Sequence, residues 1–436
     1  MSSSLSTDFV RQLLEKIIAR IELSKSQLLQ LPWGTYLAPR NVAVASIAYL
    51  LLVRLLRYRR RDKIHAKFPF PTRDSLSRMT TLQAWEINKM LGEYEFPFMG
   101  QKALQFALFR TYGIPTISKL LVDTKQLSDV SLASKQRYAD TEVLIGEFVI
   151  NPPDSERTIN AISRMNYLHS GYRKSGKISN DDLLYTLSLF ALEPIKFVGM
   201  YEWRGNSELE KCAVGVFWKA IGDAQGISFE ALRRFHMGWK DGLEWLEDVQ
   251  EWATKYEQQH MVPSEYNKKT ADETVRILVY DVPGPLKWIG NQFVSCLMDE
   301  KLRTAMMYPP PYAPLKFTVD TGLLVRKYFL RYLALPRIIP FKAFSQPDPK
   351  TGRSHKVLYM SEPWYIPATF ANRWGITAWY KWTMGLPYPG DPKYEPDGYD
   401  LEEVGPKLFR GKGKKEMEET RRTLTEARRG GCPFAV

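Results

Sequence analysis

The 436-residue sequence is poor in the residues that hold metals and form disulfides. It contains three cysteines and five histidines. The cysteines are odd in number and far apart, so they predict no disulfide framework. They are Cys212, Cys296 and Cys432. This usage is typical of a protein whose folded part stays on the reducing side of a membrane.

Short motifs of several common enzyme classes are also missing. The sequence has no GxGxxG, GxxxxGK(S/T), HExxH or GxSxG. Dinucleotide binding, nucleotide hydrolysis, zincin and serine-hydrolase chemistry therefore lack support. Strand-like alternation is limited to residues 274–280 and 356–359, and no repeat of fixed period is found.

The sequence does contain helical periodicity and enough apolar residues for a large core. Hydrophobic residues make up 44% of the chain and aromatic residues 13%. Apolar residues recur at three- and four-residue spacing in segments 81–93, 102–112, 131–150, 157–175, 181–192, 208–222, 228–258, 285–305 and 320–334. We therefore predict an all-α fold, with helices that stop at Pro152, Gly176 and Pro194.

One uncharged run, residues 41–53, is a candidate membrane anchor. Its thirteen residues span only about 20 Å as a helix, short of the roughly 30 Å hydrocarbon core of a bilayer. If Arg40 and Arg54 extend to the interface, residues 32–56 become long enough to cross. The alternative is a helix that lies on the membrane or is buried in the protein.

A cluster of cations follows this run and predicts the orientation of the anchor. Six cations lie within residues 54–63, whereas Arg40 stands alone just before the run. Such a cluster can bind nucleic acid, but beside an apolar run it favours a cytosolic membrane flank, and we predict no nucleic-acid partner. Residues 1–31 are then lumenal and residues 57–436 cytosolic. Because residues 2–8 are polar, no cleavable signal peptide is predicted.

The segment Arg164–Arg173, RMNYLHSGYR, places His169 on the inner face of a predicted helix. Helical spacing puts Ile162, Met165 and Asn166 before it and Tyr172 and Arg173 after it on the same face. Haem iron is a natural partner for an imidazole among apolar groups and a cation. The alternative is a core histidine that bonds a carbonyl or a carboxylate.

The preceding predicted helix carries an arginine and a hydroxyl on an apolar face. Positions 133, 137, 141, 144 and 148 read Ala, Arg, Thr, Leu and Phe. Arg137 and Thr141 could therefore act as donors that stabilise negative charge on bound dioxygen. Alternatively, Arg137 pairs with a buried carboxylate and Thr141 bonds back to its own helix.

Together these two helices resemble the catalytic domain shared by the latex-clearing rubber oxygenases and the fungal, endoplasmic-reticulum-bound MpaB-type oxygenases. Arg137 and Thr141 match the pattern Arg-x-x-x-Thr, and His169 and Arg173 match His-x-x-x-Arg. Residues 178–204 are similar to the fungal MpaB branch in particular, and the whole similarity covers roughly residues 75–320. It departs where rubber oxygenases carry a lysine before the threonine, because this chain has Asp140 there.

The resemblance implies a globin-like, helical core that binds a b-type haem through His169. Arg137 and Thr141 would lie on the oxygen-binding side, and Arg173 or Arg164 would pair with a haem propionate or orient the helix. The implied reaction adds dioxygen to a carbon–carbon double bond of an isoprenoid or fatty substrate and cleaves it at the endoplasmic reticulum membrane. A haem-dependent hydroxylase or peroxidase and a non-enzymatic, membrane-tethered haem or lipid carrier are the alternatives.

The remaining segments complete a predicted division of the chain. It comprises residues 1–31 in the lumen, 32–56 as the anchor, 57–74 as a basic linker, 75–345 as the catalytic domain, and 346–436 as a proline- and aromatic-rich extension with a charged tail. Residues 320–335 either lie on the membrane or form an ordinary helix. The tryptophans and tyrosines of residues 364–382 close an apolar layer or rest on the membrane. Glu257 and His260 have di-iron ligand spacing, but no second copy stands out.

Overall fold

The computed structural model describes residues 38–124, 132–359, 362–427 and 431–434, and for residues 132–134 the backbone alone. Among these residues there is no β-strand, and strand-like pairing is limited to two isolated bridges, Phe344 with Lys356 and Ser354 with Tyr399. The predicted all-α class is confirmed. The predicted lumenal segment, residues 1–31, lies outside the described residues.

The chain forms two compact units, which we describe separately. The first contains the residues up to Arg59 together with residues 332–335, and the second contains residues 60–331 and 336–436. In the first unit, α3 (Pro39–Arg57) begins with a proline in its first turn. The Tyr49 hydroxyl donates to the Leu333 carbonyl at 2.6 Å, and Arg57 donates to the Ala334 carbonyl at 3.2 Å.

The α3 helix has the properties expected of the predicted anchor. Most of its apolar side chains are exposed, among them Ile47, Leu51 and Leu55. The continuous helical stretch Pro39–Lys67 is long and apolar enough to cross a membrane. A second helix, Asn180–Tyr201, passes the same test, but it is mostly buried and belongs to the core. Of the predicted anchor, residues 32–37 are not among those that the structure describes.

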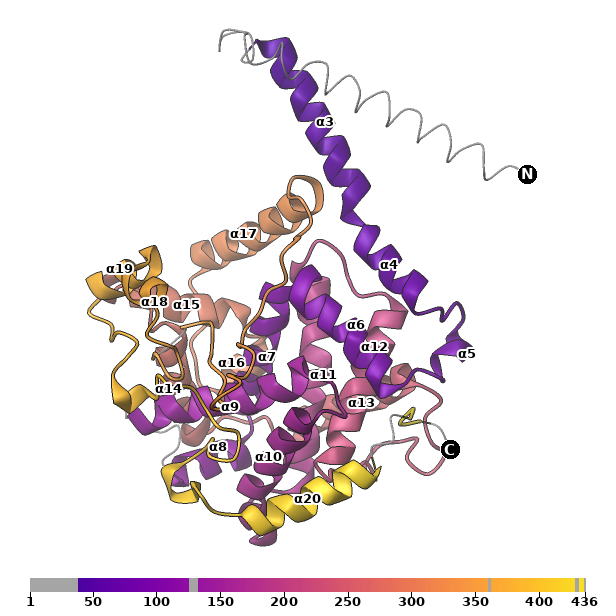
Figure 1. Cartoon of the computed structure of the whole chain (residues 1–436), viewed down its shortest axis with the longest axis vertical. Helices are drawn as coiled ribbons and strands as arrows, with labels where there is room; N and C mark the ends of the chain where they lie inside the picture. Colours follow the sequence, from indigo (N-terminus) through magenta and orange to yellow (C-terminus); the bar gives the residue numbers. More distant parts are fainter. Residues whose placement is uncertain (1–37, 125–131, 360–361, 428–430, 435–436) are drawn as a thin grey trace. The chain divides into compact units, whose positions relative to one another are not determined.

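The second unit is a bundle of helices (Figure 1). Its helices are α4 (Arg59–Lys67), α5 (Arg73–Leu76), α6 (Thr81–Met90), the π-helical η1 (Leu91–Glu95), α7 (Pro97–Thr111), α8 (Pro115–Asp123), α9 (Leu132–Ile150), α10 (Glu156–Lys174), α11 (Asn180–Tyr201), α12 (Glu208–Ala224), α13 (Gly242–His260), α14 (Glu265–Leu278), η2 (Gly284–Leu286), α15 (Lys287–Leu297), α16 (Glu300–Ala305), α17 (Ala313–Tyr332), α18 (Phe370–Trp374), α19 (Ile376–Thr383), η3 (Pro392–Tyr394), η4 (Lys407–Phe409) and α20 (Lys414–Ala427). The core forms where α11 packs on α7, α12 packs on α6 and α13, and α10 packs on α9 and α20.

Two of the predicted helices are wrong in extent because polar side chains end them. Residues 228–241 are turns, and α13 begins only after Asp241, whose carboxylate accepts the backbone N–H groups of Leu243 and Glu244. The segment 285–305 is divided into α15 and α16 by Asp299, which caps α16 and also binds Arg110.

Two further predictions fail because tertiary packing overrides local signals. α11 continues through Pro194 to Tyr201, where a stop was predicted. Proline has no N–H, so the Phe190 carbonyl loses its helical partner there. The strand candidate at residues 274–280 is instead the end of α14, which runs to Leu278. Segment 356–359 contributes only the isolated bridge at Lys356.

The C-terminal segment after residue 345 packs along α9 and α10. Lys135 of α9 forms an ion pair with Glu362 at 2.5 Å, and Arg157 of α10 donates to the Ser354 hydroxyl at 3.0 Å. Residues 346–436 therefore belong to the same compact unit as the helical core. The domain boundary at residue 345 stays a prediction.

Candidate functional site

The candidate site lies at one end of the helical hairpin formed by α9 and α10. The short connection 151–155 and the ion pair between Glu147 and Arg157 place the end of α9 beside the start of α10. The first turns of α9 and the last turns of α10 therefore share the opposite end. Arg137 and His169 lie there, close enough for the charge of Arg137 to lower the pKa of the His169 imidazole.

His169 is a half-buried side chain in the last turns of α10. Among the described residues, no group forms a hydrogen bond with it. Burial, and then the positive charges of Arg137 and Arg173, lower the pKa of His169 to about 4. At neutral pH the ring is therefore uncharged and has a lone pair available, which is the state in which histidine binds metals.

Arg137 is half-buried as well, and its guanidinium has no carboxylate partner among the described residues. Burial lowers its pKa, and the nearby Asp140, Tyr112 and Tyr172 only partly oppose this effect. An arginine in a protein nevertheless stays charged. Within the described part of the chain, no carboxylate lies within ion-pair distance of it and no side-chain hydrogen bond engages it. The donors of Arg137 are thus available to a ligand.

Asp140 and Thr141, which follow Arg137 on α9, already have partners. The Tyr365 hydroxyl donates to Asp140 at 2.6 Å, and burial raises the pKa of Asp140 to about 6. The Thr141 hydroxyl donates to the Arg137 carbonyl at 2.9 Å, which is the back-bonding alternative for this threonine. Its oxygen retains a free lone pair, and the side chain lines a large cavity.

Arg164 and Arg173 bind backbone carbonyls. Arg164 is fully buried and donates to the carbonyls of Val404, Phe409 and Lys412, which hold the C-terminal segment against α10. Arg173 is exposed and donates to two carbonyls at the end of α12, at 2.8 and 2.7 Å. Both arginines thus tie α10 to neighbouring segments, which agrees with the predicted role of orienting the helix. Pairing with a haem propionate stays a prediction.

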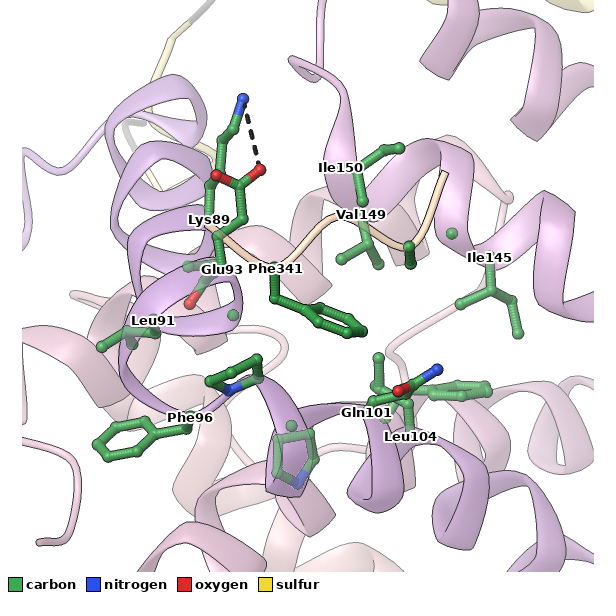
Figure 2. Close-up of a pocket in the computed structure, with 18 of the residues that line it drawn as sticks. Lys89, Leu91, Glu93, Phe96, Gln101, Leu104, Ile145, Val149, Ile150 and Phe341 are labelled. Carbon is green, nitrogen blue, oxygen red and sulfur yellow. Dashed lines mark ion pairs between the residues drawn. The ribbon is translucent and has the colours of Figure 1, made fainter. Parts of the chain in front are cut away.

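The cavity beside Thr141 has a volume of about 620 Å³, within the range typical of ligand pockets. Its walls come from α6, η1, α7, α9, α11, α12 and residues 340–346. Figure 2 shows the Phe341 side chain extending into the space among Leu104, Ile145 and Val149. At its rim Lys89 forms an ion pair with Glu93 at 4.0 Å. The cavity can thus hold a largely apolar molecule.

The cavity wall and the His169 end of the hairpin are about one helical turn apart. Thr141 of α9 and Leu108 of α7 line the cavity. One helical turn beyond them lie Arg137 and Tyr112, which interact electrostatically with each other. Arg137 and His169 do not themselves line the cavity. The structure therefore brings Arg137 and His169 together and places Thr141 between them and the cavity.

Residues 340–346, which we call the strap, close one side of the cavity. The Phe341 N–H donates to the Glu93 carbonyl at 2.8 Å, which belongs to the π-helical turn η1. Phe344 packs against Gly146, where a Cβ atom would overlap the phenyl ring. Sequence reasoning missed both the strap and η1. Pro340 was the only local signal, and π-helical turns, although frequent at functional sites, have no simple sequence mark.

The competing metal sites are not formed. The Glu257 carboxylate binds Arg110 at 2.7 Å and Tyr185 at 2.8 Å, while His260 is exposed and packs on Tyr256. No cluster of three or more metal-ligating side chains occurs in residues 38–124, 132–359, 362–427 and 431–434.

Comparison with known proteins gives close relatives. No protein-family model matches the chain. The chain is 47% identical over 392 residues to ER-bound oxygenase mpaB' of Penicillium brevicompactum, which covers 89% of this chain and 92% of the relative. ER-bound oxygenase mpaB of the same organism is 44% identical over 347 residues, 79% of this chain and 82% of the relative. ER-bound oxygenase mpaB of Penicillium roqueforti (strain FM164) is 50% identical over 262 residues, 60% of this chain and 88% of the relative.

Proposed function

The chain belongs to the mpaB family of ER-bound oxygenases, and on that premise we propose that it is a haem-dependent oxygenase of the endoplasmic reticulum membrane. The observation that supports haem binding is the state of the hairpin end that carries Arg137 and His169, which we call the open end. His169 offers an uncharged imidazole without a hydrogen-bond partner among the described residues, and Arg137 offers a charged group without a counter-ion there. Buried polar groups are normally satisfied, so such a pair is typical of a ligand site.

The residues present fit a haem group. An uncharged imidazole without a hydrogen-bond partner among the described residues suits an iron ligand, so His169 would hold the iron. The cavity of about 620 Å³, which Thr141 lines and His169 does not, would hold the apolar substrate. When bound, haem supplies the activation of dioxygen that protein side chains cannot perform. The cavity lining includes many apolar side chains, so an apolar substrate bound there would be shielded from much of the solvent.

In this proposal Arg137 provides a fixed positive charge for the oxygen-binding side. Its guanidinium is held by a helix in a half-buried setting, where a charged donor stabilises developing negative charge more than it would in water. Thr141 contributes less, because its proton already bonds the Arg137 carbonyl. The substrate we propose is an isoprenoid or fatty molecule that is cleaved at a carbon–carbon double bond to carbonyl products.

Spectroscopy of the purified full chain tests the haem, and product analysis tests the reaction. We expect a Soret band and about one iron per chain, and consumption of oxygen with a polyprenyl-tailed substrate. Mass spectrometry should show two carbonyl fragments. A single hydroxylated product would identify a hydroxylase instead, and haem binding without oxygen consumption would identify a carrier. A colourless, iron-free protein would overturn the haem assignment.

We also propose a single membrane crossing with the catalytic part in the cytosol. α3 is apolar and exposed along most of its length, and cations follow it. Protease added to sealed microsomes should digest the region around His169, and protection of that region would contradict the orientation. Ala48→Asp lies in the middle of α3 and should cost roughly 2.5 to 3.5 kcal/mol of insertion free energy. Unchanged membrane retention of this variant would argue against α3 as the anchor.

A further inference from the structure

Large apolar side chains are concentrated on one set of segments of the second unit, and they are exposed. The segments are α15, residues 313–331 of α17, residues 336–342, and α18 with α19. Representative side chains are Trp288, Phe317, Ile338, Phe370, Ile376 and Trp382. Ile338 and Ile376 are 87% and 91% exposed. Contiguous apolar surface of this kind marks an interaction site rather than ordinary surface variation.

Polar contacts link neighbouring segments, which places their exposed apolar side chains in one region of the second unit. The backbone N–H of Tyr312, at the start of α17, donates to the Gln292 side chain of α15 at 3.0 Å. Lys381 of α19 forms an ion pair with Asp281, which lies just before α15, at 2.9 Å. Figure 1 draws α15, α17, α18 and α19 in the same part of the second unit.

The same surface continues to the strap of the cavity. Lys381 also donates to the Tyr359 carbonyl at 2.8 Å, and the nearby Val357 N–H donates to the Ala343 carbonyl of the strap at 2.9 Å. Ile338 and Ile339 directly precede Pro340, which lines the cavity. The exposed apolar residues therefore reach the edge of the cavity.

The charge of these segments is almost entirely positive. They contain one acidic residue, Asp320, which pairs with Lys316 at 2.9 Å. Their cationic residues are Lys287, Lys316, Arg326, Lys327, Arg331, Arg337, Lys342, Arg373 and Lys381. Four of these cations are exposed without an acidic partner among the described residues, namely Lys287, Arg337, Lys342 and Arg373. The chain as a whole is far more balanced, with 61 cations and 48 acidic residues.

We propose that this surface, the lipid-facing surface, enters the interface of an anionic membrane. Tryptophan and tyrosine favour the boundary between headgroups and acyl chains, because their rings are apolar and carry one polar atom. Exposed lysine and arginine residues attract acidic headgroups. We further propose that apolar ligands pass from the bilayer to the cavity beside the strap, which rests on the proposed function.

Fluorescence labelling of the full chain tests the membrane contact without any assay of activity. In a Cys432→Ser background, an environment-sensitive dye is attached to Phe317→Cys or to Ile376→Cys. Met237→Cys is the matched control, because Met237 is 80% exposed and lies outside the lipid-facing surface. The proteins are reconstituted in phosphatidylcholine and phosphatidylserine vesicles with or without brominated acyl chains.

We expect strong quenching by brominated lipid and blue-shifted emission at positions 317 and 376, and neither at position 237. Because α3 holds all three proteins at the vesicle, the control separates contact from mere proximity. Equal quenching at all three positions, or none at 317 and 376, would overturn the proposal. A blue shift that needs no lipid and grows with protein concentration would identify self-association instead.

Kinetics test the delivery of ligand. Phe317→Asp with Ile376→Asp should raise KM several-fold for a substrate dissolved in vesicles and leave kcat unchanged, whereas Met237→Asp should change neither. Normal KM in the double variant would overturn delivery even if the dye is quenched. If the wild type turns over no substrate while the dye is quenched, the proposed function fails and the membrane contact stands.

Discussion

Both ends of the α9–α10 hairpin carry charged or polar side chains, but among the described residues these side chains are paired at one end only. At the end that carries Glu147, which we call the closed end, this carboxylate accepts hydrogen bonds from Arg157, Tyr399 and Asn151, so both of its oxygens have partners. At the open end, the charge of Arg137 acts on His169, and neither side chain has such a partner in the described part of the chain. One pair of helices thus carries both a structural ion pair and a ligand site.

The comparison separates stability from function. Removing one partner of a buried ion pair leaves an uncompensated charge, which is strongly destabilising. Arg137 and His169 form no ion pair with a described residue, and Arg137 acts on the nearby Asp140 only through its charge, so removing either should cost less stability. Substitutions at the closed end should therefore lower the free energy of unfolding, whereas substitutions at the open end should change ligand binding and activity.

The largest effect is expected from His169→Ala, which should abolish stoichiometric haem binding because it removes the iron ligand. The Soret absorbance and iron content of the purified variant measure this. His236→Ala and His260→Ala are the controls, since both histidines are exposed. Unaltered iron content in His169→Ala would mean that the open end is not a haem site.

Arg137→Ala should retain haem but lose activity by on the order of a hundredfold, since it removes a charged donor at the oxygen-binding side. Thr141→Ala should lose less, because the Thr141 proton bonds the Arg137 carbonyl. Oxygen consumption at saturating substrate compares the two variants. Normal turnover in Arg137→Ala would place this arginine among the structural residues and remove the contrast between the two ends.

Arg157→Ala should lower the free energy of unfolding by about 3 kcal/mol, because Glu147 then keeps only its two weaker donors. Urea unfolding in detergent, followed by tryptophan fluorescence, measures this, and the haem content of the folded variant should stay normal. Arg137→Ala serves as the matched variant at the open end. If it proved the less stable of the two, the assignment of the ends would be reversed.

The smallest effect concerns Asp140, whose pKa is raised to about 6 by burial despite the hydrogen bond from Tyr365. The folded protein then binds this proton more readily than the unfolded chain does. Its ionised form therefore costs stability above about pH 6, by about 2 to 3 kcal/mol, and the cost disappears as the pH falls toward 4. Asp140→Asn should remove this component of the pH dependence. An identical stability profile in the variant would contradict the raised pKa.

Sequence periodicity was sufficient to find the hairpin and to orient its polar side chains. The spacing of Arg137 and Thr141 along one helical face, and the position of His169 in the next helix, predicted that these helices carry the site. Both signals are local, because they depend on residues a few positions apart. The structure places Arg137 beside His169 and Thr141 on the cavity wall.

The remaining features depend on contacts between distant segments. No local sequence pattern predicts that Asp248 binds Trp239 and Arg234 and thereby holds the turns before α13. Nor does the sequence show that Tyr365 will reach Asp140, or that the strap will cross η1. These contacts form only when the chain has folded, so helical periodicity cannot predict them.

Because Gly146 has no side chain, Phe344 of the strap can pack directly against α9. This close packing has an evolutionary consequence. Because Phe344 occupies the space that a Cβ atom at position 146 would need, the two positions cannot vary independently. An alanine at position 146 becomes acceptable only when position 344 carries a smaller side chain. The two positions should therefore coevolve across relatives, and each paired change would remodel the end of the cavity and so alter which ligands fit.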